Sequence, residues 1–460
     1  MPMKHIAVFD VGKTNKKLLV FDEQYQLVYE QSKTFDEIKD EDGFACENIE
    51  AVSEWLLHSF EKIISDNRFT IVAVNFSGYG ASFVHIDEKG EVVLPLYNYL
   101  KPYSPVLQKQ FYDKYGGEHL VSKQTASPVL GNLNSGMQLY RLKFEKPKEY
   151  AKVSYSLHLP QYLSYLLTSI PVSDITSIGC HTNLWNFADN KYHEWVVEEN
   201  VDTKLAPIQS SAKAIQLKKD NRNIAAGIGL HDSSSALIPY LRSFNEPFIL
   251  LSTGTWCISL NPFNHSTLSD YELHNDCLCY LSFTGKPVKA SRLFAGYEHE
   301  QQVKRLAEHF HKAPGYYKTV VYNPSFINKA SLQFPVTNTS EDIAMIKQSQ
   351  FENRRLEDFN SYEEAYHQLI ADIIEQQVRS TKLVLSGTAV KKIFVDGGFG
   401  MNPVFMNLLA ESFADYKVYA AEVGQASALG AALVIHEYWN TYPLPDNLVE
   451  LKEYQITNPQ

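Results

Sequence analysis

Residues 6–22, "IAVFDVGKTNKKLLVFD", contain two apolar runs of strand length joined by a short polar turn. This turn collects glycine, threonine, asparagine and lysines, although a plain hairpin turn needs only glycine or asparagine. Residues 248–262, "FILLSTGTWCISLNP", repeat the arrangement with Ser, Thr and Gly at the turn. The second stretch lies about half the chain length after the first. The sequence therefore predicts two related domains, each presenting a polar hairpin turn to a shared cleft.

Length and composition agree with two domains. The chain has 460 residues, 44% of them hydrophobic and 21% charged, which is typical of a soluble globular protein with more than one core. Helical patterns precede strand-like runs, as in residues 47–66 before 69–78 and residues 361–385 before 391–398. This alternation predicts an α/β architecture. We expect the break near Pro239 to Pro247, with domains at 1–241 and 242–460.

Charge and cysteine content exclude several classes of protein. A net charge of −11 and a pI near 5.8 argue against a surface for nucleic acid or an anionic membrane. We find no cleavable leader and no apolar run of membrane-spanning length, so we expect a cytoplasmic protein. The five cysteines are scattered, which indicates free thiols. They are Cys46, Cys180, Cys257, Cys277 and Cys279.

Both polar turns have the composition of a phosphate-binding loop. Backbone N–H groups of a tight glycine turn, together with hydroxyl and ammonium groups, form a concave donor site for phosphate oxygens. Each could equally be only a turn, and "GKT" is not a Walker A loop, because a strand follows it where that motif opens a helix. Lys13 could contact phosphate or simply be solvated. The candidate nucleotide-binding residues are Gly12, Lys13, Thr14 and Asn15 in the first turn and Gly254 and Thr255 in the second.

Asp10 ends the first apolar strand and directs a carboxylate to the same turn. A carboxylate beside phosphate oxygens is a typical ligand for hydrated Mg²⁺. We therefore assign Asp10 as the candidate metal ligand.

Residues 391–413, "KKIFVDGGFGMNPVFMNLLAESF", predict a strand, a glycine-rich turn and a helix. Asn402 is the expected N-cap, with Pro403 in the first helical position. The glycines Gly397 and Gly398 would let the backbone approach a flat ligand. This segment is a candidate nucleotide site.

Residues 225–240, "AAGIGLHDSSSALIPY", place His231 and Asp232 between a glycine-rich strand and a helix. We expect an exposed position at the mouth of a sheet. Asp232 could cap the helix through the amides of Ser234 or Ser235, or it could perform chemistry, and the two roles are compatible.

The order of these four segments resembles the FGGY carbohydrate kinases, members of the actin-like, sugar-kinase and heat-shock ATPase superfamily. "HDSSSAL" and "FSGYGASFVHIDEKGEVVLPL" look most similar to the rhamnulose and fuculose kinase branch. The resemblance implies two ribonuclease H-like α/β domains with a catalytic cleft between them. The N-terminal domain would hold the sugar and the first phosphate loop. The C-terminal domain would hold the second phosphate loop and the adenosine.

The resemblance also implies roles for single residues. Asp232 corresponds to the catalytic base, and His231 and Gly80 correspond to sugar contacts. Asp174 matches a sugar-side loop, although an Asp-x-Thr turn needs no ligand to explain it. Tyr79 lies in the presumed sugar region, where an aromatic ring can stack on a sugar, although tyrosine is also an ordinary core residue.

These features predict an ATP- and Mg²⁺-dependent kinase that phosphorylates a hydroxyl of a small ketose such as L-rhamnulose or L-fuculose. An ordinary aspartate pKa of about 3.9 would leave Asp232 ionised and able to accept the hydroxyl proton. The alternatives are a kinase for another sugar such as xylulose, or a non-catalytic sugar or nucleotide sensor. The expected partners are the sugar and ATP, and a homodimer is left open.

Three stretches depart from the family pattern. Ser82 stands where relatives carry an acidic residue, and residues 97–104, "YNYLKPYS", replace a W-x-D-x-R-like stretch. Because these positions contact the sugar in the family, these departures leave the identity of the sugar undetermined. In "KASRLFAGYEHEQQ", residues 289–302, Arg292 and Glu298 could be cleft residues or a surface ion pair, and we favour the surface pair.

Overall fold

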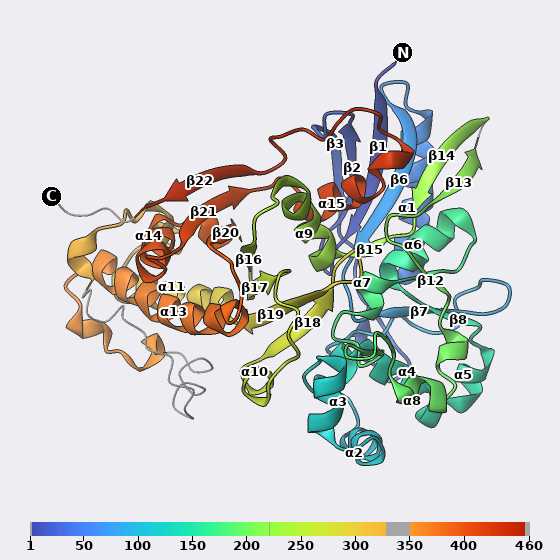
Figure 1. Ribbon diagram of the computed structural model, residues 1–460, viewed down its shortest axis with the longest axis horizontal. Helices are drawn as coiled ribbons and strands as arrows, with labels where there is room; N and C mark the ends of the chain where they lie inside the picture. The colour runs from blue at the N-terminus through green and yellow to red at the C-terminus, as the bar shows by residue number, and fades with distance from the viewer. Residues whose placement is uncertain (1, 220, 328–349, 456–460) are drawn as a thin grey trace. The chain divides into compact units, whose positions relative to one another are not determined.

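The computed structural model describes residues 2–219, 221–327 and 350–455. The chain divides into two compact α/β units (Figure 1). Unit 1 consists of Met1–Ser243, Cys279–Pro287 and Gly424–Leu448, and unit 2 consists of Phe244–Leu278, Val288–Val423 and Val449–Gln460. The chain therefore enters each unit three times, and the units are not two contiguous halves.

The central sheet of unit 1 confirms the hairpin predicted at residues 6–22. Its strand order is β13-β14-β6-β1-β2-β3, and β15 also pairs with β6. Strands β1, β2 and β3 form an antiparallel meander, whereas β6 runs parallel to β1, and β14 and β15 run parallel to β6. The bounds are β1 Lys4–Val11, β2 Lys16–Asp22, β3 Leu27–Lys33, β6 Thr70–Gly78, β13 Ala214–Lys219, β14 Arg222–Gly227 and β15 Leu230–His231.

Helices cover both faces of this sheet. Helices α1 (Ile49–Ser65) and α6 (Leu159–Thr168) contact β6 and each other, and α9 (Asp232–Ser243) packs on α15 (Ala426–Val434), which contacts β1 and β6. Helix α1 confirms the helix predicted over residues 47–66. Since alternate residues of a strand point to opposite faces, Phe9 enters the core under α1 while Asp10 points to α15.

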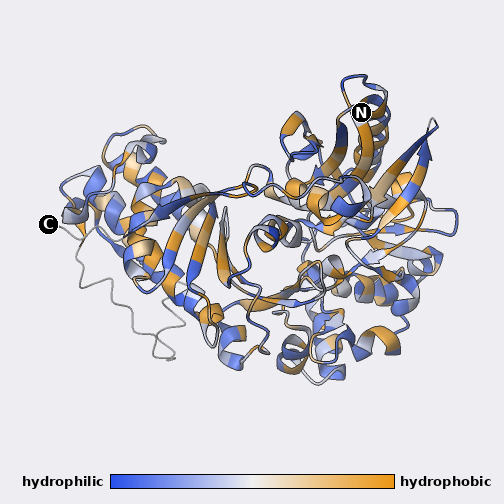
Figure 2. Cartoon of the chain, turned by 45° about the horizontal axis from the view of Figure 1, so that its top comes forward, coloured by the Kyte–Doolittle hydropathy of each residue, from blue (hydrophilic) through white to orange (hydrophobic). Residues whose placement is uncertain are grey.

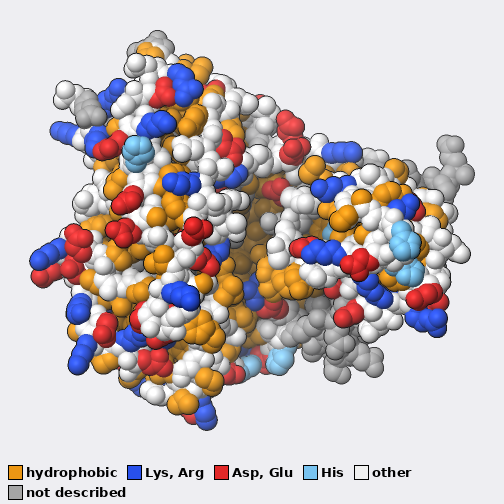
Figure 3. Space-filling view, turned by 180° about the vertical axis from the view of Figure 1, so that it is seen from behind, with side chains coloured by type: hydrophobic (Ala, Val, Ile, Leu, Met, Phe, Trp, Pro, Cys, Tyr) orange, Lys and Arg blue, Asp and Glu red, His pale blue; other side chains and the backbone are white. Residues whose placement is uncertain are grey.

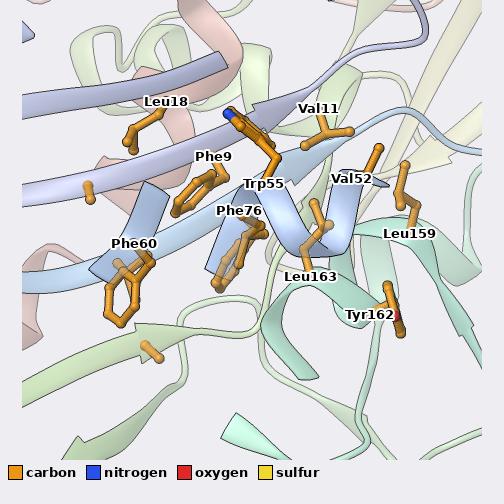
Figure 4. Packing of buried hydrophobic residues seen from close by; sticks show 14 of the residues in the cluster. Phe9, Val11, Leu18, Val52, Trp55, Phe60, Phe76, Leu159, Tyr162 and Leu163 are labelled. Carbon is orange, nitrogen blue, oxygen red and sulfur yellow. The ribbon is translucent and has the colours of Figure 1, made fainter. Parts of the chain in front are cut away.

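Aromatic rings fill the core on the α1 side. The Phe9 ring packs edge-on against Trp55 at a centroid distance of 5.5 Å and lies 6.1 Å from the roughly parallel ring of Phe76 (Figure 4). All three side chains are buried. This packing holds the strand that carries Asp10 in a fixed register.

Smaller elements complete unit 1. They are β4 Ile38–Lys39, β5 Ala45–Cys46, β7 Phe83–Ile86, α2 Pro105–Lys114, α3 Glu118–Thr125, α4 Ser135–Glu145, α5 Pro147–Lys152, β8 Tyr155–His158, β9 Ser173–Asp174, α7 Ile175–Ile178, β10 Trp185–Asn186, β11 Lys191–Tyr192, α8 Glu194–Glu198 and β12 Ile208–Gln209.

Unit 2 repeats the topology of unit 1. In its strand order, β18-β19-β17-β16-β20-β21-β22, strands β16, β17 and β19 form the antiparallel meander, while β20 and β21 continue the sheet in parallel on the other side of β16. The bounds are β16 Phe248–Thr253, β17 Cys257–Asn261, β18 Cys277–Leu281, β19 Pro287–Leu293, β20 Lys392–Gly397, β21 Lys417–Glu422 and β22 Glu450–Tyr454. The shared order supports the duplication that the two hairpins predicted.

The helices of unit 2 pack on one another and on this sheet. Helix α13 contacts α11, α14 and β17. The bounds are α10 Asp270–His274, α11 Ala295–His309, α13 Tyr362–Leu385 and α14 Pro403–Ser412. Helix α13 confirms the helix predicted over residues 361–385.

Hydropathy follows this architecture. Figure 2 shows hydrophobic residues concentrated along the strands of both sheets, with hydrophilic residues on many loops and outer helix faces. On the face drawn in Figure 3, acidic and basic side chains are interspersed over the described residues rather than segregated by sign. No helix in the described part of the chain is both long and apolar enough to span a membrane. All five cysteines are buried free thiols, as predicted.

Candidate active site

The carboxyl ends of three neighbouring strands bring the predicted catalytic residues of unit 1 to one edge of the sheet. Asp10 of β1 pairs with Ser77 of β6, and Ser77 also pairs with Leu230 of β15. Asp232 follows β15 directly as the first residue of α9. In α/β sheets the carboxyl ends of parallel strands are the usual place for ligands. The fold thus collects carboxylates that lie more than 200 residues apart in sequence.

Asp10 is partly exposed, and a hydrogen bond from α15 holds its carboxylate. Ser427 of α15 donates its hydroxyl to Asp10 Oδ2 at 2.8 Å. Burial raises the pKa of Asp10 to about 6, and the nearby negative charge of Asp232 acts in the same direction. Two carboxylates that repel each other electrostatically favour binding of a cation nearby. Such a cation could also bind the oxygens of an incoming phosphate.

Asp232 differs from the sequence expectation in two respects. Its Oδ1 accepts a hydrogen bond from the Ser233 amide at 2.6 Å, not from Ser234 or Ser235. Burial raises its pKa to about 6, so the expectation of an ordinary aspartate was wrong. About 35% of the side chain is still exposed, which leaves the carboxylate accessible to a ligand.

His231 is buried, whereas an exposed position was expected. Its Nε2 lies 3.3 Å from Cys180 Sγ and 3.5 Å from Asp232 Oδ1, and its ring stacks on Tyr280 at 6.0 Å. Burial lowers its pKa to about 4, so the imidazole is neutral. A Cβ atom on Gly80 would lie 2.5 Å from this ring, so Gly80 is needed for the ring to fit. The two predicted sugar contacts therefore touch each other.

Tyr79 is buried beside the same loop. Its hydroxyl donates to Glu47 Oε2 at 3.3 Å, and its ring meets Tyr99 edge-on at 6.2 Å. Tyr99 is partly exposed and lies within electrostatic reach of both Lys13 and Asp232. Tyr99 is thus the more accessible ring of the pair, and the sequence analysis did not select it.

The lysines of the first hairpin turn are all ion-paired. Lys13 Nζ lies 2.8 Å from Glu37, Lys16 Nζ lies 2.8 Å from Glu47, and Lys17 Nζ lies 3.0 Å from Glu30. Lys13 is therefore not simply solvated. At the tip, Thr14 and Asn15 are exposed, and the Gly12 amide donates to the Asn15 carbonyl at 2.9 Å. Thr14 and Asn15 leave the tip open to a ligand.

Asp174 is completely buried and caps α7, so the geometry supports the turn interpretation rather than direct sugar contact. Its carboxylate accepts hydrogen bonds from the Thr176 amide at 2.9 Å and from the hydroxyls of Thr176 and Ser211. Thr176 Oγ1 in turn accepts the His231 amide at 3.0 Å. Asp174 thereby positions the backbone of His231.

The structure also defines the surroundings of two residues from the stretches that depart from the family pattern. Arg292 does not form a surface pair with Glu298: it is 9% exposed and donates to Asp276 Oδ1 at 2.6 Å. Ser82 is 1% exposed and its hydroxyl points to the Tyr97 carbonyl at 3.4 Å.

Unit 2 contains a cavity of about 520 Å³ at the end of β16 and β20. This volume suits a drug-sized or nucleoside-sized ligand, since such pockets measure about 300–1,000 Å³. The predicted residues Gly254, Gly398 and Asn402 line it. The other lining residues are Thr253, Gly296, His299, Tyr317, Lys318, Phe399, Met401 and Pro403.

The glycine-rich segment has the structure that the sequence predicted. Asn402 caps α14 by accepting the amides of Val404 and Phe405, and Pro403 follows in the first turn. Gly397 has φ of +89°, and a Cβ there would lie 2.0 Å from the Thr253 carbonyl oxygen. Gly397 thus permits close strand packing, whereas Gly398 has open space around its α-carbon.

The second hairpin turn packs on the start of α11. A Cβ on Gly296 would lie 1.8 Å from the Gly254 carbonyl oxygen, and the Tyr297 amide donates to the Thr255 carbonyl at 3.1 Å. Gly254 and Thr255 are exposed at the tip. The tip and the helix N-terminus therefore form one continuous wall of the cavity.

Sequence reasoning selected three of the eleven residues that line this cavity and did not select, among others, His299, Tyr317 and Lys318. His299 belongs to the stretch of residues 289–302, in which the sequence analysis singled out only Arg292 and Glu298. Tyr317 and Lys318 lie in a short 3₁₀ turn, Tyr316–Thr319, that has no helical periodicity to reveal it. Only the tertiary structure places them beside Gly254.

These observations define the class: two α/β units of the same topology, each with a polar hairpin turn and candidate site residues at the carboxyl ends of its central strands. Residues 5–237 match the FGGY family of carbohydrate kinases, N-terminal domain, and residues 245–442 match carbohydrate kinase FGGY, C-terminal domain. The chain belongs to the FGGY family of carbohydrate kinases.

Individual relatives are distant. A rhamnulokinase from Mannheimia succiniciproducens is 22% identical over 272 residues, an alignment that covers 56% of this chain and 54% of the relative. A second rhamnulokinase, from Oceanobacillus iheyensis, is 22% identical over 274 residues. This alignment covers 56% of this chain and 56% of the relative. The matched region spans about half the length of these curated relatives.

The fold is shared over the whole chain. A carbohydrate kinase from Novosphingobium aromaticivorans superimposes with a TM-score of 0.79 at 21% identity, covering 100% of this chain and 95% of the other.

Proposed function

We propose that this chain is an ATP-dependent sugar kinase that transfers the γ-phosphate to a hydroxyl of a small ketose. The observation that carries the proposal is the accessible Asp232 carboxylate, at the same sheet edge as Asp10, in a chain of the FGGY family. A non-catalytic sensor needs no base at this position.

Asp232 is proposed as the general base. Phosphoryl transfer passes through a loose transition state, so the protein mainly aligns the acceptor and neutralises charge. A carboxylate with a pKa of about 6 is mostly ionised at neutral pH and is a stronger base than an ordinary aspartate. It accepts the hydroxyl proton as the new P–O bond forms and the bond between the γ-phosphorus and the bridging oxygen of ATP breaks, which releases ADP.

The unit 2 cavity is proposed to bind the nucleotide. Its volume and its backbone-rich wall of glycines fit a nucleoside with attached phosphates. Lys318 lines this cavity, and among the described residues no carboxylate lies within ion-pair distance of it. Because the lysines of the first turn are already paired, we assign the main phosphate-binding ammonium group to Lys318.

Asp10 is proposed as the metal ligand. Mg²⁺ is commonly held by one or two carboxylates together with water and substrate phosphates, so a single accessible carboxylate fits the ion. No group of three or more candidate ligands occurs in the described part of the chain, which suits a cation that arrives with the nucleotide. When bound, the ion neutralises phosphate oxygens, while Ser427 fixes the orientation of Asp10.

The sugar is proposed to be a deoxyketose such as L-rhamnulose or L-fuculose, on the strength of the rhamnulokinase relatives. A xylulose kinase from Lactobacillus acidophilus has the same fold, with a TM-score of 0.77 at 17% identity, covering 99% of this chain and 94% of the other. Xylulose is therefore the alternative substrate to be tested.

A panel of ketoses, aldoses and polyols tests the proposal, with ADP release followed by a coupled assay. We expect turnover with one sugar to depend on Asp232, so Asp232→Asn should lower kcat by roughly 10²–10⁴-fold. Asp113→Asn is the matched control, because Asp113 is an exposed residue of α2 that pairs with Lys109. Lack of ADP release with every sugar, or full activity of Asp232→Asn, would contradict the proposal.

A further inference from the structure

His299 lines the unit 2 cavity but was not among the site residues predicted from the sequence. It lies on the first turns of α11 and is only 9% exposed. Its ring meets Tyr317 edge-on at 5.0 Å and Phe399 edge-on at 5.2 Å. These two contacts hold the imidazole rigidly in the wall of the cavity.

A chain of hydrogen bonds fixes which nitrogen of His299 carries the proton. Asn402 uses its carbonyl oxygen to accept the amides of Val404 and Phe405, so its NH₂ group is the end that meets Tyr366 Oη, at 2.7 Å. An amide NH₂ only donates, so Tyr366 Oη accepts this bond.

The Tyr366 hydroxyl hydrogen then needs an acceptor, because Tyr366 is fully buried. Among the described residues, the acceptor in reach is His299 Nε2, at 3.0 Å. Nε2 is therefore unprotonated, and the neutral ring carries its hydrogen on Nδ1. Burial lowers the pKa of His299 to about 4, which keeps the ring in this neutral form.

The Nδ1–H group has no protein acceptor among the described residues, although the side chain is nine-tenths buried and lines the cavity. The side chain lines the cavity, so a ligand in the cavity can accept the hydrogen bond that Nδ1–H offers. The aromatic neighbours Tyr317 and Phe399 suit a nucleoside better than a phosphate chain.

We propose that His299 is a nucleotide-specificity residue: its Nδ1–H, oriented by Tyr366 and Asn402, donates a hydrogen bond to an acceptor atom of the nucleoside. Tyr366 and Asn402 are positioning residues that act through His299. This inference rests on the proposed nucleotide site, and it adds a donor that no sequence motif contains.

Two isosteric variants separate the two nitrogens. In His299→Asn the amide nitrogen can occupy the place of Nδ1, while the partner of Tyr366 is lost. In His299→Gln the amide can reach Tyr366, while the donor to the cavity is lost. We expect His299→Gln to weaken adenosine and ADP equally, by about three- to tenfold, and His299→Asn to retain more of both affinities.

Calorimetric titration of adenosine and ADP into each full-length variant measures these affinities. The control variant is His309→Phe, because His309 is exposed at the far end of the same helix. Equal binding by wild type and His299→Gln would overturn the inference. A loss confined to ADP would also overturn it, since that result assigns His299 to the phosphates. If wild type binds neither ligand, the proposed nucleotide site itself fails.

The ¹⁵N chemical shifts of the His299 ring test the tautomer independently, with His299→Asn used to assign the signal. We expect an Nδ1–H pattern in wild type and a mixture of tautomers in Tyr366→Phe. If the ¹⁵N chemical shifts of wild type show the proton on Nε2, the inference is overturned. This test of the wild-type protein holds even if every variant folds poorly.

Discussion

The imidazole of His231 occupies the space that a side chain at residue 80 would need: a Cβ atom on Gly80 would lie 2.5 Å from both Cδ2 and Nε2 of His231. His231 cannot retreat easily, because Cys180 and Tyr280 pack against its ring. A methyl group at residue 80 must therefore displace the ring that precedes Asp232.

Gly80→Ala should destabilise the fold by about 1–3 kcal/mol and raise the KM for the sugar, because overpacking moves His231. Chemical denaturation and steady-state kinetics measure the two effects. Adding His231→Ala should restore most of the stability, since the clash is then removed. Gly315→Ala, where a Cβ meets nothing within 4 Å, should change neither quantity. A fully stable and active Gly80→Ala enzyme would contradict this account.

The rate should depend on pH through the carboxyl pair. The pKa values of Asp232 and Asp10 are both raised to about 6. The base works only when ionised, so kcat/KM should fall as the pH drops through about 6, with a slope between one and two if both groups titrate. A pH–rate profile in which activity persists to pH 4.5 would be incompatible with Asp232 as the base.

Replacing Asp232 should raise thermal stability at neutral pH. Its pKa in the folded chain lies above the ordinary value, so the folded chain binds the proton more tightly than the unfolded chain. Ionised Asp232 therefore opposes folding above pH 6, and the effect disappears as the pH falls toward 4. The Tm of Asp232→Asn should exceed that of wild type at pH 7.5, and the difference should shrink at pH 4.5. An equal or lower Tm at pH 7.5 would argue against the raised pKa.

Asp10→Asn should change the metal dependence rather than nucleotide affinity. Asparagine can still accept the Ser427 hydroxyl, but it lacks the charge that favours Mg²⁺. We expect a higher Mg²⁺ concentration for half-maximal activity and an unchanged Kd for adenosine. If the activity of Asp10→Asn depends on Mg²⁺ concentration in the same way as that of wild type, Asp10 is not a metal ligand.

Lys318→Met should weaken ADP and ATP binding by about tenfold and leave adenosine binding unchanged, because the ammonium group is assigned to the phosphates. Lys312→Met is a suitable control, since Lys312 is an exposed lysine of the same region that lies over Tyr316 and outside the cavity. If adenosine and ADP lose affinity to the same extent, Lys318 contacts the nucleoside or shapes the cavity instead.

Local patterns were sufficient for much of this protein. The hairpin at residues 6–22, the long helix at 361–385 and the Asn402 cap follow from period-two alternation, period-3.6 amphipathicity and capping chemistry. These signals act over a few residues, so a single sequence contains them in full. The repeated polar turn also revealed the duplication, because both copies kept the same composition.

Side-chain environment could not be predicted in the same way. Lys13 was weighed as a phosphate contact or a solvated residue, but it pairs with Glu37, and Asp174 is enclosed by Ser211. The raised pKa of Asp232 results from burial, which the sequence around residue 232 does not reveal.

The sequence by itself determined the two α/β units, their hairpin turns and the place of Asp10, Asp232 and the glycine-rich loop on strand ends, since these depend on local periodicity. The tertiary structure alone decided what surrounds them: that Ser427 binds Asp10, that His231 is buried against Gly80, and that His299, Tyr317 and Lys318 line one cavity. Burial and ion pairing arise between residues tens to hundreds of positions apart, and the chain brings those residues together only when it folds.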